Sequence, residues 1–108
     1  MPLIMLLEYS GKGDAARSFV REMEEKGIAD EIRKAPGCLR YEYFLPYKEN
    51  GSVLLIDEWT EQAALDAHHD SQSMKDLAAL REKYDLHMKA TRCVTEALPD
   101  FDNSFIRK

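Results

Sequence analysis

The segment of residues 53–59 constrains the fold more than any other part of the sequence. Its first four residues, Val-Leu-Leu-Ile, are apolar at every position, so a strand here would carry apolar side chains on both of its faces. The helices of one small chain can cover only one face of a sheet, and something else must cover the other face. A second copy of the same sheet is the simplest cover, so the sequence predicts a homodimer that pairs through sheet faces.

Turn signals divide the rest of the chain into elements whose order predicts the topology. Apolar or alternating runs indicate strands, and apolar residues at helical spacing indicate helices. The expected strands are 3–9, 38–45, 53–59 and 86–97, and the expected helices are 14–34, 61–69 and 72–84. Gly27 is expected to weaken or kink the first helix, and Asn50-Gly51 predicts a hairpin turn. The order βαββαβ predicts an α+β protein of the ferredoxin-like class with an antiparallel sheet.

Size and charge limit the possible partners. The 108 residues suit a single domain, which we expect to span residues 1–97 and to be followed by a C-terminal tail at 98–108. The formal net charge of -5 argues against nucleic acid and anionic membranes as partners. The N-terminal apolar run is too short for a signal peptide or a membrane span. We therefore expect a cytoplasmic protein in which Cys38 and Cys93 are buried, reduced thiols.

Three stretches of the sequence carry a resemblance to a known family. They are Ala-Pro-Gly-Cys-Leu-Arg-Tyr-Glu at 35–42, Leu-Leu-Ile-Asp-Glu-Trp-Thr-Glu-Gln-Ala-Ala-Leu-Asp-Ala-His at 54–68, and Ser-Met-Lys at 73–75. The most specific element is Asp57 and Trp59 followed by His68, nine residues after the Trp. With these stretches the chain resembles the antibiotic biosynthesis monooxygenase (ABM) family, and most closely its small members assigned as quinol monooxygenases.

The resemblance implies a dimeric α/β barrel with a small-molecule pocket between the sheet and the helices of each chain. It also implies an oxidoreductase, a monooxygenase that oxidises a quinol-like or polyphenolic aromatic with O₂ and needs no metal, flavin or haem. A deprotonated dihydroxy-aromatic can itself reduce O₂, so the protein need supply only an apolar slot, a base and a polar group for the developing anion. The sequence itself contains no metal-ligand spacing and no Gly-rich nucleotide loop. We therefore expect no metal and no cofactor.

Two other functions remain open at this point. One is an isomerase of the same fold that acts on a small phosphorylated sugar signal, for which Arg40 and Arg92 are the candidate cations. The other is a ligand-binding or stress-response barrel without chemistry. Haem degradation is not expected, because Ala78 stands where the haem-degrading branch has its haem-ligating His. The chain also departs from many family members at Ser73, where they carry a second His.

His68 is the first candidate for catalysis. It shares a helix face with Ala64 and Leu65, which directs it inward, and its ordinary pKa suits proton transfer near neutral pH. It would act as the base, or else it is a core histidine that hydrogen-bonds a backbone carbonyl or Asp57. Asp57 is the second catalytic candidate, because it could orient His68, although it could also cap the neighbouring loop.

Aromatic and sulfur-containing side chains are the candidates for substrate binding. Asp57 and Trp59 share one face of the strand 53–59 by alternation, so Trp59 could stack on a flat substrate or simply pack against a helix. The remaining candidates could line an aromatic-friendly pocket or fill the core, and they are Tyr9, Tyr41, Tyr43 and Met74.

Overall fold

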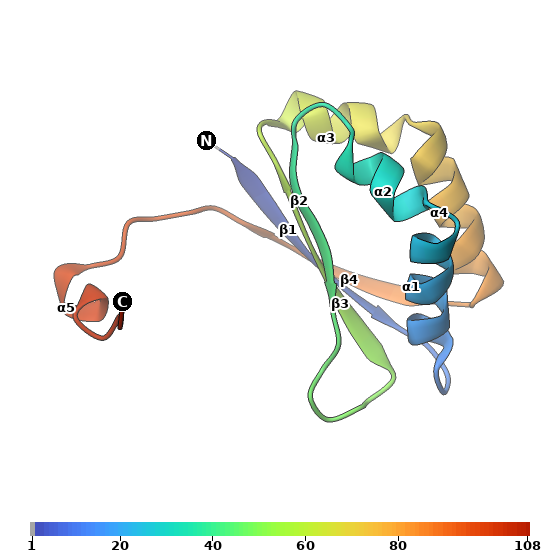
Figure 1. The fold of residues 1–108 in the computed structure, drawn as a ribbon, viewed down its shortest axis with the longest axis horizontal. Coiled ribbons are helices and arrows are strands. Elements are labelled where there is room, and N and C mark those ends of the chain that lie inside the picture. Colours follow the sequence, from blue (N-terminus) through green and yellow to red (C-terminus); the bar gives the residue numbers. More distant parts are fainter. Residues whose placement is uncertain (1) are drawn as a thin grey trace.

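The computed structural model describes residues 2–108 and contains one four-stranded sheet with helices on one of its faces (Figure 1). In chain order the elements are β1 (Leu3–Ser10), α1 (Ala15–Glu25), α2 (Ile28–Arg33), β2 (Cys38–Phe44), β3 (Ser52–Trp59), α3 (Gln62–His69), α4 (Gln72–Lys83), β4 (His87–Cys93) and α5 (Asp100–Asn103). The strands lie in the order β2-β3-β1-β4, and each neighbouring pair is antiparallel. The predicted ferredoxin-like α+β fold is therefore confirmed. Within residues 2–108, every helix lacks the length and apolar character that a membrane crossing requires.

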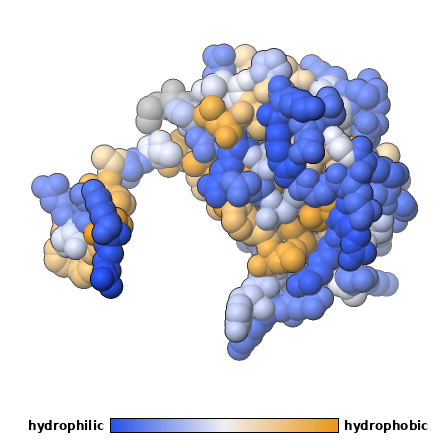
Figure 2. All heavy atoms as spheres, viewed as in Figure 1, coloured by the Kyte–Doolittle hydropathy of each residue, from blue (hydrophilic) through white to orange (hydrophobic). Residues whose placement is uncertain are grey.

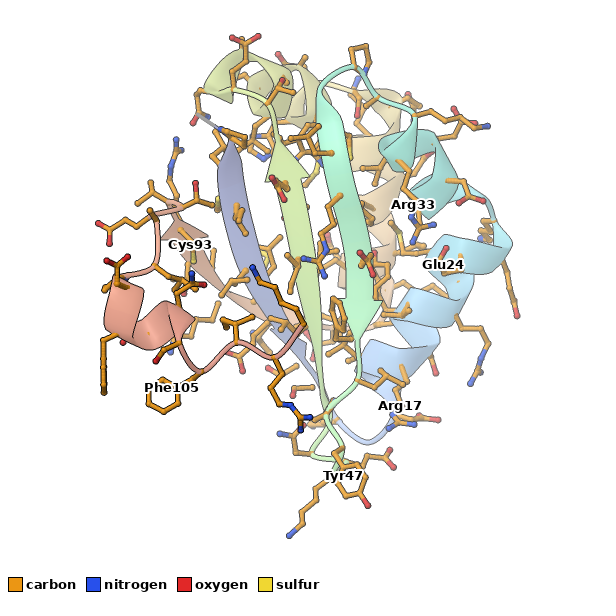
Figure 3. All side chains as sticks on the ribbon, turned by 60° about the vertical axis from the view of Figure 1, so that its left-hand side comes forward. Arg17, Glu24, Arg33, Tyr47, Cys93 and Phe105 are labelled. Carbon is orange, nitrogen blue, oxygen red and sulfur yellow. The ribbon has the colours of Figure 1, made fainter. Side chains whose placement is uncertain are left out.

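The first predicted helix, residues 14–34, is in fact two helices, because Gly27 interrupts it. Gly27 has a φ of 75°, a left-handed conformation that glycine adopts without the steric cost of a side chain. Arg33 then ties α2 to its neighbours, since its Nε donates to the carbonyl of Tyr41 at 2.9 Å. Its guanidinium also pairs with Glu24 of α1 at 2.7 Å (Figure 3). These bonds hold α1, α2 and β2 in one arrangement.

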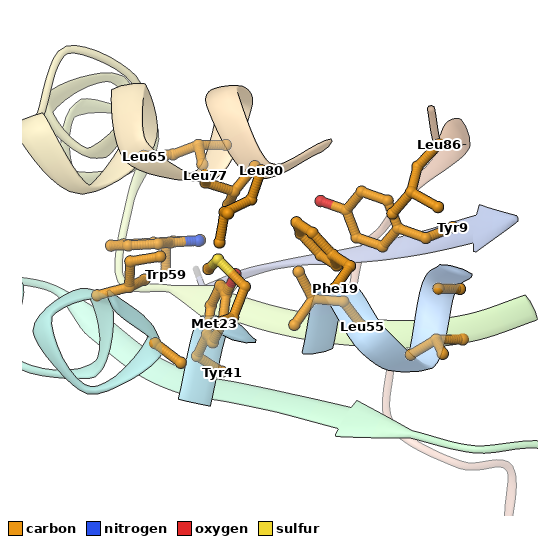
Figure 4. Close-up of a cluster of buried hydrophobic side chains, with 14 of the residues drawn as sticks. Tyr9, Phe19, Met23, Tyr41, Leu55, Trp59, Leu65, Leu77, Leu80 and Leu86 are labelled. Carbon is orange, nitrogen blue, oxygen red and sulfur yellow. The ribbon is translucent and has the colours of Figure 1, made fainter. Parts of the chain in front are cut away.

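The core lies between the inner face of the sheet and helices α1 to α4 (Figure 4). Along β3 the burial alternates strictly, with every second side chain buried and the others half-buried. The largest fully buried side chains are Trp59, Tyr9, Phe19, Met23, Ile32, Leu55 and Val53. Burial of one such large apolar side chain contributes about 1.5 to 3 kcal/mol to stability. Asp57 and His68 are the polar exceptions, with only 3% and 6% of their surfaces exposed.

The opposite face of the sheet is not covered by any helix of residues 2–108 (Figure 1). Leu6 and Ile56 lie opposite each other across β1 and β3, and both are only half-buried. Leu54 pairs with Phe44 on the same face, and Phe44 is exposed. The apolar run 53–56 is therefore covered on one face only, and its second face is the surface through which the homodimer is predicted.

The chain leaves the sheet after Cys93, earlier than the predicted strand end at residue 97. Cys93 pairs with Ile4, and β1 begins only one residue before Ile4, so β4 has no further partner. Residues 98–108 project from the domain on the side of the open sheet face, with α5 within them (Figures 1 and 3). Figure 2 shows apolar side chains both on this projecting segment and on the side of the domain that faces it. Four large apolar side chains of the segment are exposed, namely Leu98, Phe101, Phe105 and Ile106.

The two cysteines differ from the prediction in their burial. Cys38 and Cys93 are free thiols, and each is half-buried rather than buried. Each lies at the end of a strand, Cys38 at the start of β2 and Cys93 at the end of β4, where cover by neighbouring elements is incomplete. Burial nevertheless raises the pKa of the Cys38 thiol.

Candidate active site

A cavity of about 240 Å³ lies between the inner face of the sheet and helices α3 and α4. Ligand pockets typically have volumes of about 300 to 1,000 Å³, so this cavity suits one small ring system. Its walls are mostly apolar, with Leu7 and Leu55 from the sheet facing Leu65 and Leu77 from the helices. Five of the seven predicted site residues line it, and they are Tyr9, Tyr41, Asp57, His68 and Met74.

The cavity wall has buried and exposed parts. Tyr41, Asp57 and His68 are buried, whereas Met88 and Ala90 of the edge strand β4 are exposed. His69, which lines the cavity next to His68, is exposed too, so the cavity wall reaches solvent on α3 as well as on β4.

Asp57 presents one carboxylate oxygen that has no partner. Its Oδ2 accepts a hydrogen bond from Nε1 of Trp59 at 2.8 Å, while its Oδ1 is buried and unpaired among residues 2–108. Burial raises the pKa of Asp57, and the hydrogen bond from Trp59 partly opposes that rise. A carboxyl group fixed through one oxygen can use the other to bind a hydroxyl group in the cavity.

His68 contacts the face of the same indole whose edge binds Asp57. Its imidazole lies over the indole of Trp59, with ring centroids 4.9 Å apart and planes inclined by 19°. Within residues 2–108 its buried Nδ1 has no hydrogen-bond partner. Burial, and secondly the charge of His69, lower the pKa of His68 to about 4, so the imidazole is neutral at pH 7. A neutral imidazole with a free ring nitrogen can accept a proton, but a pKa of about 4 makes His68 a weaker base than the ordinary imidazole that the sequence predicted.

Asp57 and His68, of which the first could orient the second according to the sequence, share no hydrogen bond within residues 2–108 and are linked through Trp59. Asp57 hydrogen-bonds the indole edge and His68 stacks on the indole face, so Trp59 holds both groups. Trp59 is fully buried and does not line the cavity, as in the packing interpretation of this residue.

Ser71 fixes the backbone between α3 and α4. Its Oγ donates to the carbonyl of His68 at 2.6 Å and accepts from the Met74 amide at 3.1 Å.

The predicted tyrosines separate into two groups. Tyr9 and Tyr41 line the cavity, whereas Tyr43 packs edge-on against Phe19 with ring centroids 6.5 Å apart and does not line it. The hydroxyl groups of Tyr41 and Tyr43 lie 2.9 Å apart and share a hydrogen bond. Burial raises the pKa of Tyr9 to about 12 and also raises that of Tyr41. Both hydroxyls in the cavity are therefore neutral and can donate hydrogen bonds.

The arginines predicted for the isomerase alternative lie elsewhere. Arg40 pairs with Glu42 at 2.8 Å and lies over the ring of Phe44, which belongs to the open face of the sheet. Arg92 donates to Gln62, and neither arginine lines the cavity. The arginine that does line it is Arg81 of α4, which the sequence analysis did not identify. Its spacing of four and seven residues after Leu77 and Met74 places it on their helix face and could have revealed it.

Residues 2–108 contain no group of three or more His, Cys, Asp and Glu side chains arranged to hold a metal ion. The polar side chains that line the cavity are instead Tyr9, Tyr41, Asp57, His68, His69 and Arg81. This set can bind a hydroxylated ring, accept a proton and stabilise an anion.

Comparison with known proteins agrees with the fold. The family model described as antibiotic biosynthesis monooxygenase matches residues 2–80, which reach from β1 into α4. No curated protein matches the sequence.

Solved structures of similar proteins share the fold over nearly the whole chain. A protein described as an antibiotic biosynthesis monooxygenase is 26% identical with a TM-score of 0.67, and the match covers 90% of this chain and 99% of that chain. A candidate antibiotic biosynthesis monooxygenase from Deinococcus radiodurans is 20% identical with a TM-score of 0.74, covering 90% and 96% of the two chains. A Bacteroides thetaiotaomicron protein of unknown function, named as a possible oxidoreductase, is 13% identical with a TM-score of 0.74, covering 85% and 95%. Since the family match spans well over half of the sequence, the chain belongs to the antibiotic biosynthesis monooxygenase family.

Proposed function

We propose that the protein is a cofactor-independent monooxygenase that oxidises a small quinol-like or polyphenolic aromatic with O₂. The observation that carries this proposal is that Asp57 and His68, each with one buried polar atom that lacks a partner among residues 2–108, both line the same mostly apolar cavity. Leaving a buried polar atom without a hydrogen bond costs about 1 to 3 kcal/mol. Such a cost is commonly retained where a ligand satisfies the atoms.

The chemistry begins with removal of a proton from the bound ring. A phenolic hydroxyl of the substrate lies against Asp57 and His68, and the neutral imidazole accepts its proton. The hydroxyl group of Tyr9, which stays protonated, donates a hydrogen bond to the developing phenolate, and the hydroxyl of Tyr41 does so while it accepts from Tyr43. The apolar walls keep water from competing for these bonds.

The electron-rich anion then reacts with O₂ as its own reductant. One oxygen atom is added to a ring carbon, and the other leaves as water with the two hydrogen atoms that the substrate loses. A 1,4-dihydroxynaphthalene and O₂ thus give a hydroxynaphthoquinone and water, with all four electrons supplied by the ring. The protein's part is to bind, to deprotonate and to exclude water.

The test is oxygen consumption by the purified protein with 1,4-dihydroxynaphthalene, compared with its His68→Ala variant. Loss of a general base commonly lowers the rate by about 10² to 10⁴. We expect the variant to fold, as measured by circular dichroism, and to lose turnover to this extent. Turnover of the variant within a few-fold of the parent protein would assign His68 to the core and refute this role.

We propose further that the protein is a homodimer joined through its open sheet faces. The half-buried apolar pair Leu6 and Ile56 supports this, and so does the exposed Phe44 beside Leu54. The projecting segment 98–108 provides additional apolar side chains on the same side of the domain. Two such faces would bury one another in the arrangement of a dimeric α/β barrel.

A further inference from the structure

Arg81 is the only arginine or lysine among the residues that line the cavity. It lies on α4, where Met74, Leu77 and Arg81 follow one another along a single helix face toward the sheet. Its side chain is half-buried, and Met88 and Ala90, which also line the cavity, are exposed. The guanidinium group therefore belongs to a more exposed part of the cavity wall than Asp57 and His68 do.

Arg81 has no carboxylate partner within residues 2–108. Three other arginines are paired with acidic side chains, Arg17 with Glu49, Arg33 with Glu24 and Asp30, and Arg40 with Glu42. Arg21, Arg92 and Arg107 also lack a carboxylate partner within residues 2–108, but all three are exposed, so water can solvate them. Arg81 alone combines partial burial, a free guanidinium group and a place in the cavity wall.

The surroundings of Arg81 favour an anion. The formal net charge of the protein is -5, so its overall field repels anions and a local cation is needed to attract one. Asp57 lies in the same cavity but does not form an ion pair with Arg81, so the two charges remain available to different parts of a ligand. The charge of Arg81 also acts on the hydroxyl of Tyr9, where it opposes the rise in pKa that burial causes. The hydroxyl of Tyr9 is thus influenced by the charges of both Arg81 and Asp57.

We propose that the cavity selects an aromatic hydroxy acid, whose ring carboxylate binds Arg81 while its phenolic hydroxyl lies at Asp57 and His68. A planar guanidinium group binds a carboxylate through two parallel hydrogen bonds. A carboxylate carries one negative charge, which matches the one arginine of the wall, whereas a phosphate monoester carries up to two. The position of the hydroxyl rests on the proposed function, whereas the carboxylate site can be tested without any turnover.

The test compares two ligands that differ only in the carboxylate, 6-hydroxy-2-naphthoate and 2-naphthol, because the naphthoate carries its carboxylate and its hydroxyl at opposite ends of the ring system. Binding is measured by titration calorimetry and by fluorescence of Trp59, the only tryptophan in the sequence, which lies directly behind His68. We expect the parent protein to bind the naphthoate more tightly than the naphthol. Arg81→Gln should weaken naphthoate binding by about 10- to 100-fold, the usual effect of losing hydrogen bonds to a charged group, and should leave naphthol binding unchanged. Arg81→Lys keeps the charge but loses the two parallel donors of the guanidinium group. Its affinity for the naphthoate should lie between those of the parent protein and of Arg81→Gln.

Arg21→Gln is the matched control, because it removes the same charge from an exposed helix position outside the cavity. It should bind both ligands as the parent protein does. Equal affinity of the parent protein for the two ligands would overturn the proposal. So would an Arg81→Gln variant that loses affinity for both ligands equally, since that would give Arg81 a packing role only.

These outcomes are independent of the proposed monooxygenase activity. If Arg81 discriminates between the ligands but no oxygen is consumed with 1,4-dihydroxy-2-naphthoate, the carboxylate site stands and the monooxygenase function fails. If 1,4-dihydroxynaphthalene is oxidised through His68 but the parent protein does not favour the naphthoate, the monooxygenase function stands and the carboxylate site is refuted.

Discussion

The imidazole of His68 lies flat on the indole of Trp59, with their centroids 4.9 Å apart. The edge of the same indole donates to Asp57 at 2.8 Å, so one buried tryptophan fixes both polar groups in the cavity wall. Trp59 thus contacts both polar groups from behind and is not among the residues that line the cavity. Its hydrogen bond and its stack with His68 can be separated by mutation.

Trp59→Phe should reduce both stability and turnover. Phenylalanine can still pack against His68 but cannot donate to Asp57, which would leave both oxygens of a buried carboxylate unpaired. We expect a loss of about 1 to 3 kcal/mol in the free energy of unfolding, measured by urea denaturation. Asp57→Asn is the control, because its side-chain carbonyl can still accept from Trp59 while its charge is removed. A Trp59→Phe protein as stable as the parent would show that the hydrogen bond contributes nothing.

The stability of the protein should depend on pH through His68. Its pKa is about 4 in the folded state and about 6.5 in an unfolded chain, so below pH 6.5 the unfolded state binds the proton first. Stability is therefore complete above pH 6.5 and is lost as the pH falls toward 4, by up to about 3 kcal/mol. The raised pKa of Asp57 acts in the opposite direction, because protonation relieves a buried charge.

The contribution of His68 is isolated by comparing the parent protein with His68→Gln in urea denaturation at pH 7 and pH 4.5. The difference in unfolding free energy between the two proteins should shift in favour of His68→Gln at the lower pH. An equal difference at both pH values would mean that the imidazole titrates normally and is not desolvated.

The protein should be a dimer at micromolar concentration. A charged side chain introduced into the open sheet face should dissociate that dimer into single chains. Ile56→Glu places a carboxylate opposite Leu6, at the centre of the apolar face, where a dimer interface would desolvate it. Light scattering after size exclusion should give the mass of two chains for the parent protein and of one for the variant. Arg21→Glu on the exposed side of α1 should leave the mass unchanged. A folded parent protein with the mass of a single chain would refute the interface.

Turnover should persist in the presence of a metal chelator. In the proposed reaction the aromatic substrate supplies all the electrons that reduce O₂, and the protein supplies only a base and hydrogen bonds. Oxygen uptake with 1,4-dihydroxynaphthalene should therefore be the same before and after treatment with EDTA and dialysis. Loss of activity that returns on adding a divalent metal, or a stoichiometric flavin or haem absorbance band, would contradict this reaction.

Sequence patterns predicted the orientation of several site residues, because side chains alternate between the two faces of a strand and recur on one face of a helix every three to four residues. Alternation along residues 53–59 places Asp57 and Trp59 on the same, inner face of the sheet, as the structure confirms. Helical spacing from Ala64 and Leu65 correctly directs His68 inward. These relationships lie within single elements, where the geometry of a strand or a helix is known in advance.

Relationships between elements could not be predicted in this way. The sequence does not show that Trp59 would lie between Asp57 and His68, nor that Tyr43 would pack on Phe19 outside the cavity. Helical spacing puts Arg81 on the same face as Met74 and Leu77, but the sequence analysis did not identify it, and the packing of α4 on the sheet places it in the cavity wall.

The sequence by itself determined the order of the elements, the antiparallel class of the sheet and which face of each element is apolar. These features follow from local steric preferences and from the burial of apolar side chains, and both depend on the order of residue types along the chain. The tertiary structure alone decided which side chains meet in the cavity and which polar atoms are left without partners. Those features depend on distances between segments far apart in the sequence, and such distances are set by how the helices pack on the sheet.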